Sequence, residues 1–209
     1  MKDADCVGFL QWALPKLGLR WPGFRKVRRQ VCKRVSGRMK ALGLAEIGQY
    51  RRRLDADPAE WRILDAACRI TVSRFYRDAE VFAVLRSQVM PALAETARAE
   101  RRPVRCWCAG CASGEEVYTL TILWAADIAP SCPDVEFEVI GTDAEPVVLR
   151  RAVRGCFSTG SLKDLPSGWR ERAFAPSGGA YCVADAFRRG VSFLEQDIRE
   201  QAPPGPFDL

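Results

Sequence analysis

The sequence predicts an α/β fold in which a doubly wound sheet follows a small all-helical region. Between residues 104 and 194, short apolar runs alternate with helical stretches, and this alternation implies parallel strand pairing. Before residue 101, apolar residues recur at helical spacing, and Arg-Arg-Pro at 101–103 marks a change of character. We therefore expect a helical domain with its linker helix at 1–100 and an α/β domain at 101–209.

Each element follows from its own periodicity and its terminal signals. In the basic helix, Val27, Val31, Val35 and Met39 lie one turn apart, and Gly43 follows as a cap. Asp57-Pro58 is typical of a helix start, and Pro91 predicts a kink. The expected helices are 6–19, 24–42, 44–54, 59–70, 81–100, 115–128, 145–155 and 169–174, and the expected strands are 104–108, 135–141, 180–184 and 191–194.

The net charge of +6 is concentrated in the first part of the chain. Residues 1–60 hold 14 Lys and Arg against 6 Asp and Glu, whereas the other 149 residues hold 18 against 20. This imbalance predicts a docking surface for an acidic partner, with a solvated helix face as the alternative. We place that surface on Arg28, Arg29 and Lys33. No nucleic-acid reader motif accompanies the charge, so we expect no nucleic-acid partner.

The nine cysteines are odd in number and irregularly spaced, so we expect free thiols and a cytoplasmic protein. No apolar run approaches the roughly 20 residues of a membrane helix, so no membrane insertion is expected. Cys106, Cys108 and Cys111 lack a second matching pair, and the chain has no histidine, so we predict no metal site. Cys111 is interpreted as a small buried side chain, with a reactive thiol as the alternative.

A glycine loop joins the first expected strand to the following helix. Gly110 and Gly114 are four residues apart, and Glu115 and Glu116 open the helix. Neither a P-loop nor a dinucleotide fingerprint has this pattern. A helix N-terminus and a glycine turn can cradle a nucleotide, but adjacent acids repel phosphate. They suit a cationic, hydroxyl-rich ligand such as S-adenosylmethionine.

Further candidates follow the next strands. Asp143 follows the second strand, where a carboxylate can accept hydrogen bonds from both ribose hydroxyls. Asp197 follows the strand 191–194 and could take an adenine amino group. Arg77 could orient an acceptor carboxylate, with a stacked surface arginine as the alternative. Because histidine is absent, a histidine base is excluded, but a carboxylate nucleophile (pKa about 4) needs none.

These segments together resemble the chemotaxis receptor glutamate methyltransferases, the CheR family. The resembling segments are 24–50, 71–82 with Arg77, 109–119, the ribose-acid segment from Gly141 to Asp143, 161–166 and 191–198. The resemblance implies a Rossmann-like class I methyltransferase sheet and S-adenosylmethionine as cofactor, with S-adenosylhomocysteine as product. It implies that Glu116 holds the methionine ammonium and that Arg77 lies beside the transferring methyl as the catalytic residue. The implied cofactor-binding residues are Ser73, Arg77, Gly110, Glu116, Asp143, Asp197 and Ile198.

The sequence departs from the family pattern at two single positions and in two segments. Val117 replaces a proline, and Asp197 replaces the asparagine of many members. The pattern also continues past Phe-Asp-Leu at 207–209 and includes, in some members, a small β-insert that grips a receptor tail. We expect the sheet to be incomplete at its C-terminal end and the insert to be absent.

The resemblance implies methyl esterification of glutamate γ-carboxylates on an acidic protein, namely the cytoplasmic helix of a chemoreceptor. Two alternatives stay open. One is a methyltransferase of the same fold that acts on another protein or a small carboxylate. The other is a non-catalytic module that senses S-adenosylmethionine or binds a partner.

Overall fold

The computed structural model describes residues 2–71 and 73–209 and divides the chain into two compact units, Met1–Ile70 and Thr71–Leu209. The sequence analysis grouped residues 71–100 with the helical domain. In the structure they pack with the second unit, because Met90, Ala94 and Ala97 are buried in the same apolar core as Val104. The described residues contain no helix long and apolar enough to cross a membrane.

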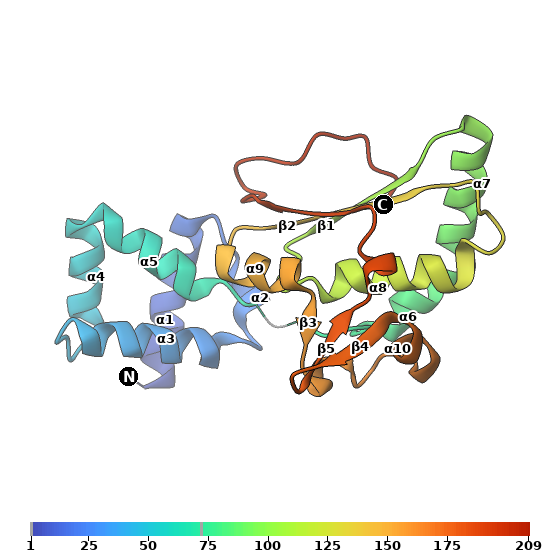
Figure 1. Cartoon of the computed structure of the whole chain (residues 1–209). Coiled ribbons are helices and arrows are strands. Elements are labelled where there is room, and N and C mark those ends of the chain that lie inside the picture. The colour runs from blue at the N-terminus through green and yellow to red at the C-terminus, as the bar shows by residue number, and fades with distance from the viewer. Residues whose placement is uncertain (1, 72) are drawn as a thin grey trace. The chain divides into compact units, whose positions relative to one another are not determined.

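The first unit is helical (Figure 1). The elements are α1 (Asp3–Ala13), η1 (Leu14–Leu17), α2 (Trp21–Phe24), α3 (Arg28–Ala41), α4 (Ile47–Ala56) and α5 (Pro58–Cys68). The apolar faces of α1, α3, α4 and α5 pack together in its core. Val31, Val35 and Met39 are buried, as their one-turn spacing predicts. Asp57 caps the helix that begins at Pro58, since its carboxylate accepts the Ala59 N–H at 3.0 Å.

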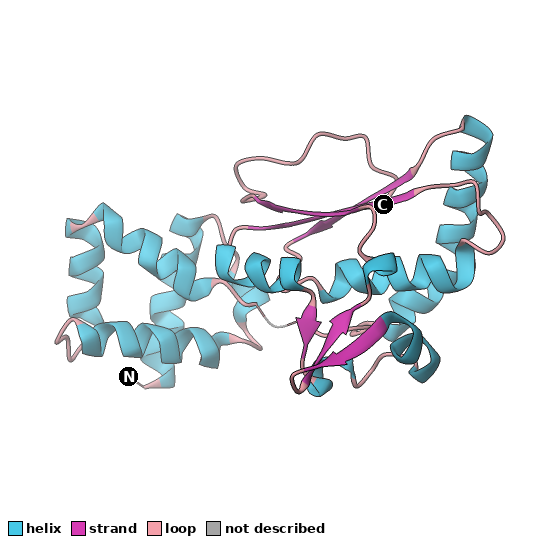
Figure 2. Ribbon diagram, in the orientation of Figure 1, coloured by secondary structure: helices cyan, strands magenta, loops and turns pink. Residues whose placement is uncertain are grey.

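The second unit contains a parallel three-stranded sheet of order β1-β2-β6, which confirms the predicted α/β fold (Figure 2). Crossover helices join the strands, as parallel pairing requires. The strands are β1 (Val104–Ala109), β2 (Phe137–Asp143) and β6 (Val191–Glu195), and the helices before β2 and β6 are α8 (Glu115–Leu123), the π-helical η3 (Trp124–Ile128) and α9 (Pro146–Arg154).

The expected long helix at 81–100 forms with an interruption ahead of Pro91. It comprises α6 (Ala79–Val84), the π-helical turn η2 (Leu85–Val89) and α7 (Met90–Glu100). Proline has no N–H to donate to the preceding turn, so the regular α-helical ladder is interrupted near it. Further along, β1 makes backbone hydrogen bonds outside the sheet: Asp208 N donates to Arg105 O and Trp107 N donates to Leu209 O, both at 2.8 Å.

A second, antiparallel sheet of order β3-β5-β4 lies between α9 and β6 in the sequence. The expectation that this chain lacks a small β-insert was therefore wrong. In Figure 2 this sheet lies on the opposite side of α8 from β1 and β2. Its elements are β3 (Cys156–Phe157), η4 (Thr159–Leu162), α10 (Ser167–Ala173), β4 (Phe174–Ser177) and β5 (Ala180–Val183), and η5 (Asp185–Phe187) follows before β6.

Two disulfides contradict the expectation that all nine cysteines are free thiols. Cys6 of α1 is joined to Cys32 of α3, with a Cα–Cα distance of 6.0 Å. Cys156 is joined to Cys182, its register partner across β3 and β5. Both pairs are 26 residues apart in sequence, and only the packing of α1 on α3 and of β3 on β5 brings them together. The free cysteines are Cys68, Cys106, Cys108, Cys111 and Cys132.

Candidate functional site

The candidate site lies where β1 and β2 end side by side. The N–H groups of Gly110 and Cys111 both donate to the carbonyl of Thr142, at 2.8 and 2.9 Å. Parallel register explains this contact, because Ala109 pairs with Thr142 at the last position of the ladder. The glycine loop after β1 is thereby fixed on the end of β2.

Asp143 links this loop to the start of α9. One carboxylate oxygen accepts the Ala112 N–H and the other accepts the Glu145 N–H, each at 2.9 Å. The carboxylate is only half-buried. Since a carboxylate has about four acceptor positions, two remain for hydroxyl groups of a ligand.

Backbone conformation explains why glycine occupies two positions of the loop. Gly110 (φ 74°) and Gly114 (φ 88°) lie in the left-handed region, which side chains disfavour. A Cβ on Gly114 would also lie 3.0 Å from the Cβ of Ala152 and 3.1 Å from the ring of Phe193. Glycine at 114 therefore allows α8 to begin directly against α9 and β6.

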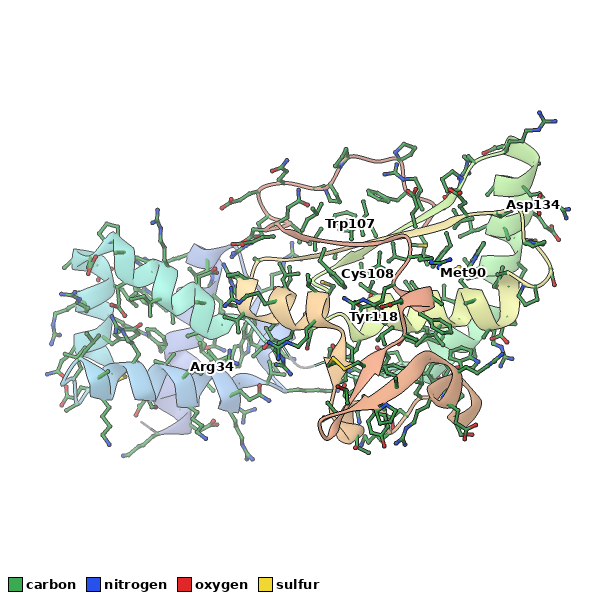
Figure 3. The ribbon with its side chains drawn as sticks, in the orientation of Figure 1. Arg34, Met90, Trp107, Cys108, Tyr118 and Asp134 are labelled. Carbon is green, nitrogen blue, oxygen red and sulfur yellow. A yellow bond between two sulfur atoms is a disulfide. The ribbon has the colours of Figure 1, made fainter. Side chains whose placement is uncertain are left out.

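Glu116 is exposed in the first turn of α8. Burial, followed by the charge of Glu116, raises the pKa of the Cys108 thiol well above its ordinary value, so the two side chains are close at the end of β1. Trp107 and Cys108 point to opposite sides of that strand (Figure 3). Two carboxylates, Glu116 and Asp143, thus lie at the carboxyl ends of neighbouring strands.

The segment that carries Ser73 and Arg77 is held beside α8 and η4. The N–H of Phe75 donates to Ser161 O at 3.1 Å, and the N–H of Tyr76 donates to the hydroxyl of Thr119 in α8 at 3.3 Å. Arg77 follows directly and is exposed. The structure therefore brings Arg77 to the helix that starts at the glycine loop.

Asp197 and Ile198 follow β6, the next strand of the same sheet, where Gln196 N donates to Asp143 O at 3.1 Å. The Asp197 carboxylate is held by the guanidinium of Arg199, with Nε donating at 2.8 Å. The Ile198 side chain is exposed. Both residues are at the expected edge of the sheet, but Asp197 has an arginine partner where the sequence suggested an adenine amino group.

The cysteines of this region are buried and remain protonated thiols. Burial, followed by the charge of Asp143, raises the pKa of Cys111 to about 12. Burial and Asp208 raise the pKa of Cys106 to about 12 as well. These thiols behave as small apolar side chains, as interpreted for Cys111.

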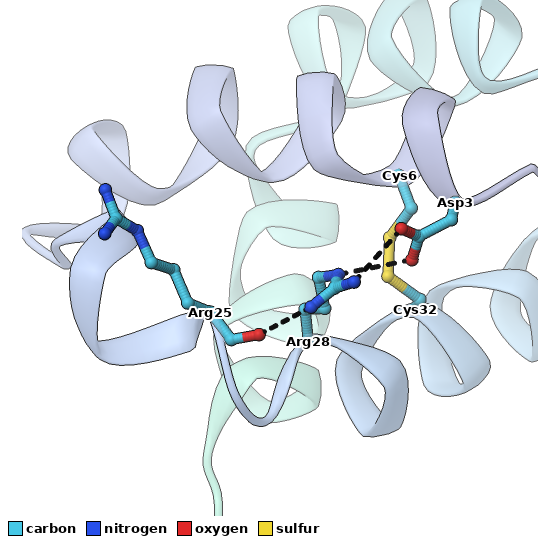
Figure 4. Close-up of a disulfide and its surroundings, with 5 residues drawn as sticks. All are labelled: Asp3, Cys6, Arg25, Arg28 and Cys32. Carbon is cyan, nitrogen blue, oxygen red and sulfur yellow. Dashed lines mark hydrogen bonds and ion pairs between the residues drawn. A yellow bond between two sulfur atoms is a disulfide. The ribbon is translucent and has the colours of Figure 1, made fainter.

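The basic residues chosen as a docking surface differ in their contacts. Arg28 donates from Nε and Nη2 to the two carboxylate oxygens of Asp3, each at 3.2 Å, and from Nη1 to the carbonyl of Arg25 (Figure 4). Arg29 and Lys33 are exposed on the same helix. Arg28 therefore stabilises the first unit, and Arg29 and Lys33 are better placed for a partner.

Sequence reasoning missed Glu115, which is only 3% exposed beside the exposed Glu116. Its carboxylate accepts hydrogen bonds from Ser113 and Ser161, each at 3.2 Å. Helical spacing does not indicate this difference, because both acids share a face with buried residues: Tyr118, Thr119 and Ile122 for Glu115, and Thr119, Leu120 and Leu123 for Glu116.

The carboxylate acceptors at this edge fit S-adenosylmethionine chemically. The ligand carries a sulfonium, an ammonium and a ribose diol. The site offers one carboxylate at a helix start and another with unused acceptor positions. Two acids would disfavour a nucleoside phosphate, whereas they attract a cation.

Comparison with known proteins agrees with this chemistry. Residues 71–209 match the model of the family "CheR methyltransferase, SAM binding domain". Chemotaxis protein methyltransferases of Salmonella typhimurium and Listeria innocua are 31% identical over 189 residues and 32% identical over 140 residues. These alignments cover 87% and 67% of this chain, and 62% and 51% of the relatives. A 104.1 kDa uncharacterised protein of Rhodobacter capsulatus is 32% identical over 181 residues, which is 86% of this chain and 19% of that protein.

This chain thus spans about half to three fifths of the length of the chemotaxis methyltransferases named above. The family model covers the whole second unit, including the glycine loop, Asp143 and the Arg77 segment. The chain belongs to the CheR methyltransferase family, and its cofactor is S-adenosylmethionine.

Proposed function

We propose that this protein transfers a methyl group from S-adenosylmethionine to glutamate γ-carboxylates of an acidic protein, a chemoreceptor helix. One observation carries the proposal. Two carboxylates lie at the ends of β1 and β2, and the segment of Arg77 is bonded to the helix between these strands. Relatives named chemotaxis protein methyltransferase support the assignment to chemotaxis.

The proposed chemistry needs no general base. The bound sulfonium supplies an electrophilic methyl group. A glutamate carboxylate is ionised at neutral pH, so its oxygen can attack the methyl carbon while the bond to sulfur breaks and its electron pair passes to sulfur. The protein therefore has only to align the reactants and exclude water. This agrees with the absence of histidine.

Each site residue has a distinct part in this proposal. Glu116 binds the methionine ammonium, and Asp143 binds the ribose hydroxyls with its two unused acceptor positions. Arg77 orients the acceptor carboxylate, since a guanidinium can donate two parallel hydrogen bonds to it. Ser73, Gly110, Asp197 and Ile198 line the same ligand.

The first unit would recruit the acidic substrate through Arg29 and Lys33. Both are exposed, whereas Arg28 is engaged with Asp3. Opposite charges on the two surfaces raise the association rate and fix the orientation of docking. A small carboxylate would not need this surface.

The test of the reaction is transfer of a labelled methyl group to a purified receptor cytoplasmic fragment. We expect an alkali-labile ester, because carboxylate esters hydrolyse readily in base, and we expect Arg77→Ala to lower the rate of its formation by at least about 100-fold. Arg98→Ala is the control, because Arg98 is an exposed arginine that pairs with Asp134. Labelling of a small dicarboxylate but not the fragment would favour the small-substrate alternative. Cofactor binding with no transfer at all would favour a non-catalytic module.

The test of docking is the double variant Arg29→Glu with Lys33→Glu. We expect methylation of the fragment to fall by at least about tenfold, because like charges now meet at the docking surface. Arg52→Glu with Arg62→Glu makes the same charge change at exposed residues of α4 and α5. Equal activity of the two double variants would contradict docking at α3.

A further inference from the structure

The adjacent acids at the start of α8 face different surroundings. Glu116 is exposed and approaches Cys108, whereas Glu115 is 3% exposed. Successive residues of a helix point about 100° apart, which explains how one acid is exposed while its neighbour is buried. The proposed function gives the methionine ammonium to Glu116 and gives Glu115 no role.

Glu115 connects the glycine loop to η4. Its Oε1 atom accepts hydrogen bonds from the hydroxyls of Ser113 in the loop and Ser161 in η4, each at 3.2 Å. Its Oε2 atom is buried and finds no hydrogen-bond partner among residues 2–71 and 73–209. One carboxylate oxygen therefore joins two segments that are 48 residues apart.

The same connection continues to the Arg77 segment. Ser161 accepts the N–H of Phe75 on its carbonyl at 3.1 Å, and Phe75 is fully buried between the rings of Phe157 and Phe174. Arg77 lies two residues beyond Phe75. A second link is independent of the Glu115 side chain: the Thr119 hydroxyl donates to Glu115 O at 2.7 Å and accepts the Tyr76 N–H.

Stability alone does not explain an acid at this position. A buried polar atom without a partner destabilises the fold, and an apolar side chain of similar size would avoid this. We infer that Glu115 is a positioning residue that acts through Ser161 to hold the Arg77 segment at the start of α8. This inference rests on the proposed function, in which Arg77 orients the acceptor carboxylate.

Hydrogen–deuterium exchange on the full chain tests the physical link. Glu115→Ala removes the acceptor of Ser161, so the Phe75 amide should exchange at least about tenfold faster. The Tyr76 amide should change less, because its partner Thr119 is retained. Glu115→Gln keeps one acceptor oxygen and should restore the protection of Phe75. Thr121→Val is the matched control, since Thr121 is also buried in α8 but, within the described part of the chain, its hydroxyl bonds only to Tyr118 O at 3.0 Å.

A double-mutant cycle tests the role in the reaction. Glu115→Ala should lower kcat/KM by about 30-fold, because a misplaced orienting group loses much of its effect. If Glu115 acts through Arg77, adding Glu115→Ala to Arg77→Ala should lower kcat/KM no further. Glu115→Gln should stay within about threefold of the parent, since it still accepts from the serines.

Three outcomes separate this inference from the proposed function. Additive losses of Glu115→Ala and Arg77→Ala, or equal Phe75 exchange in the parent and Glu115→Ala, would overturn the inference while the methyl transfer of the parent stands. If the parent transfers no methyl group, the proposed function is wrong. The same double-mutant cycle, measured as the Kd of S-adenosylhomocysteine, would then decide whether Glu115 acts through Arg77. Additive losses of binding free energy in that cycle would again reject the inference.

Discussion

Replacing Asp143 with asparagine should weaken cofactor binding strongly, because this carboxylate has two tasks. It accepts the N–H groups of Ala112 and Glu145, each at 2.9 Å, and it has two acceptor positions left for the ribose. An asparagine has one oxygen and one NH₂ group. Its NH₂ group replaces an oxygen that accepts one backbone N–H and has one position left for the ribose, so Asp143→Asn loses one acceptor on each side.

The magnitude follows from the hydrogen bonds removed. Loss of one charge-assisted bond to the ribose at about 2 kcal/mol, and loss of the charge from the remaining one at about 1 kcal/mol, weaken binding by about 3 kcal/mol. This corresponds to about a 150-fold rise in Kd. Isothermal titration calorimetry with S-adenosylhomocysteine measures it directly, without a need for turnover.

Asp134→Asn is the matched control. Asp134 precedes β2, at the end opposite to Asp143, and its exposed carboxylate pairs with Arg98 at 3.1 Å. Asp134→Asn removes the same charge at the far end of the strand from the site, so the Kd of this variant should stay within about threefold of that of the parent. If Asp143→Asn also stays within about threefold, the carboxylate does not bind the ribose and the site assignment fails.

Other predictions concern the stability and reactivity of the chain. Glu60→Gln should destabilise the first unit by about 2 kcal/mol in urea at pH 7, because buried Glu60 accepts two hydrogen bonds from Arg38. The hydrogen bonds from Arg38 lower the pKa of Glu60 in the folded state. The Glu60 carboxylate therefore stabilises the fold fully above the ordinary carboxyl pKa, and this stabilisation is lost as the pH falls through the folded pKa. The difference in unfolding free energy between Glu60→Gln and the parent should thus vanish at low pH. Removing the Cys6–Cys32 disulfide, which closes a 26-residue separation, should destabilise by about 3 kcal/mol in the same assay. Iodoacetamide at pH 8 should label the cysteines within 106–111 only after unfolding, since they are buried and their pKa values are raised. Mass spectrometry measures the labelling, and rapid labelling of these cysteines in the native protein would contradict this prediction.

Local sequence signals were sufficient for much of the second unit. The glycine loop, the start of α8 and the strand end at Asp143 are set by neighbouring residues, so glycine spacing and apolar runs identified them. The parallel pairing of β1 with β2 also follows, because a strand, a crossover helix and a parallel strand form one local unit. The edge that gathers Gly110, Glu116 and Asp143 could therefore be predicted.

Features that depend on tertiary packing were missed. The strand expected at 180–184 forms as β5, but it pairs antiparallel with β3 and β4 and not with the parallel strands. Its neighbour β3 has only two residues, Cys156–Phe157, too few for an alternating pattern, so the sequence did not indicate this small sheet. The disulfides join cysteines that only folding brings together, so spacing could not reveal them. The different surroundings of Glu115 and Glu116 depend on Ser161, which is distant in sequence.

The central claim is that glutamate side chains receive the methyl group, and peptide mass spectrometry of a methylated receptor fragment tests it most directly. We expect the added methyl groups to lie on glutamate residues, to be removed by mild alkali, and to form at least about 100-fold more slowly with Arg77→Ala than with Arg98→Ala. Methyl groups on lysine, an alkali-stable product, or equal methylation by Arg77→Ala and the parent would contradict it.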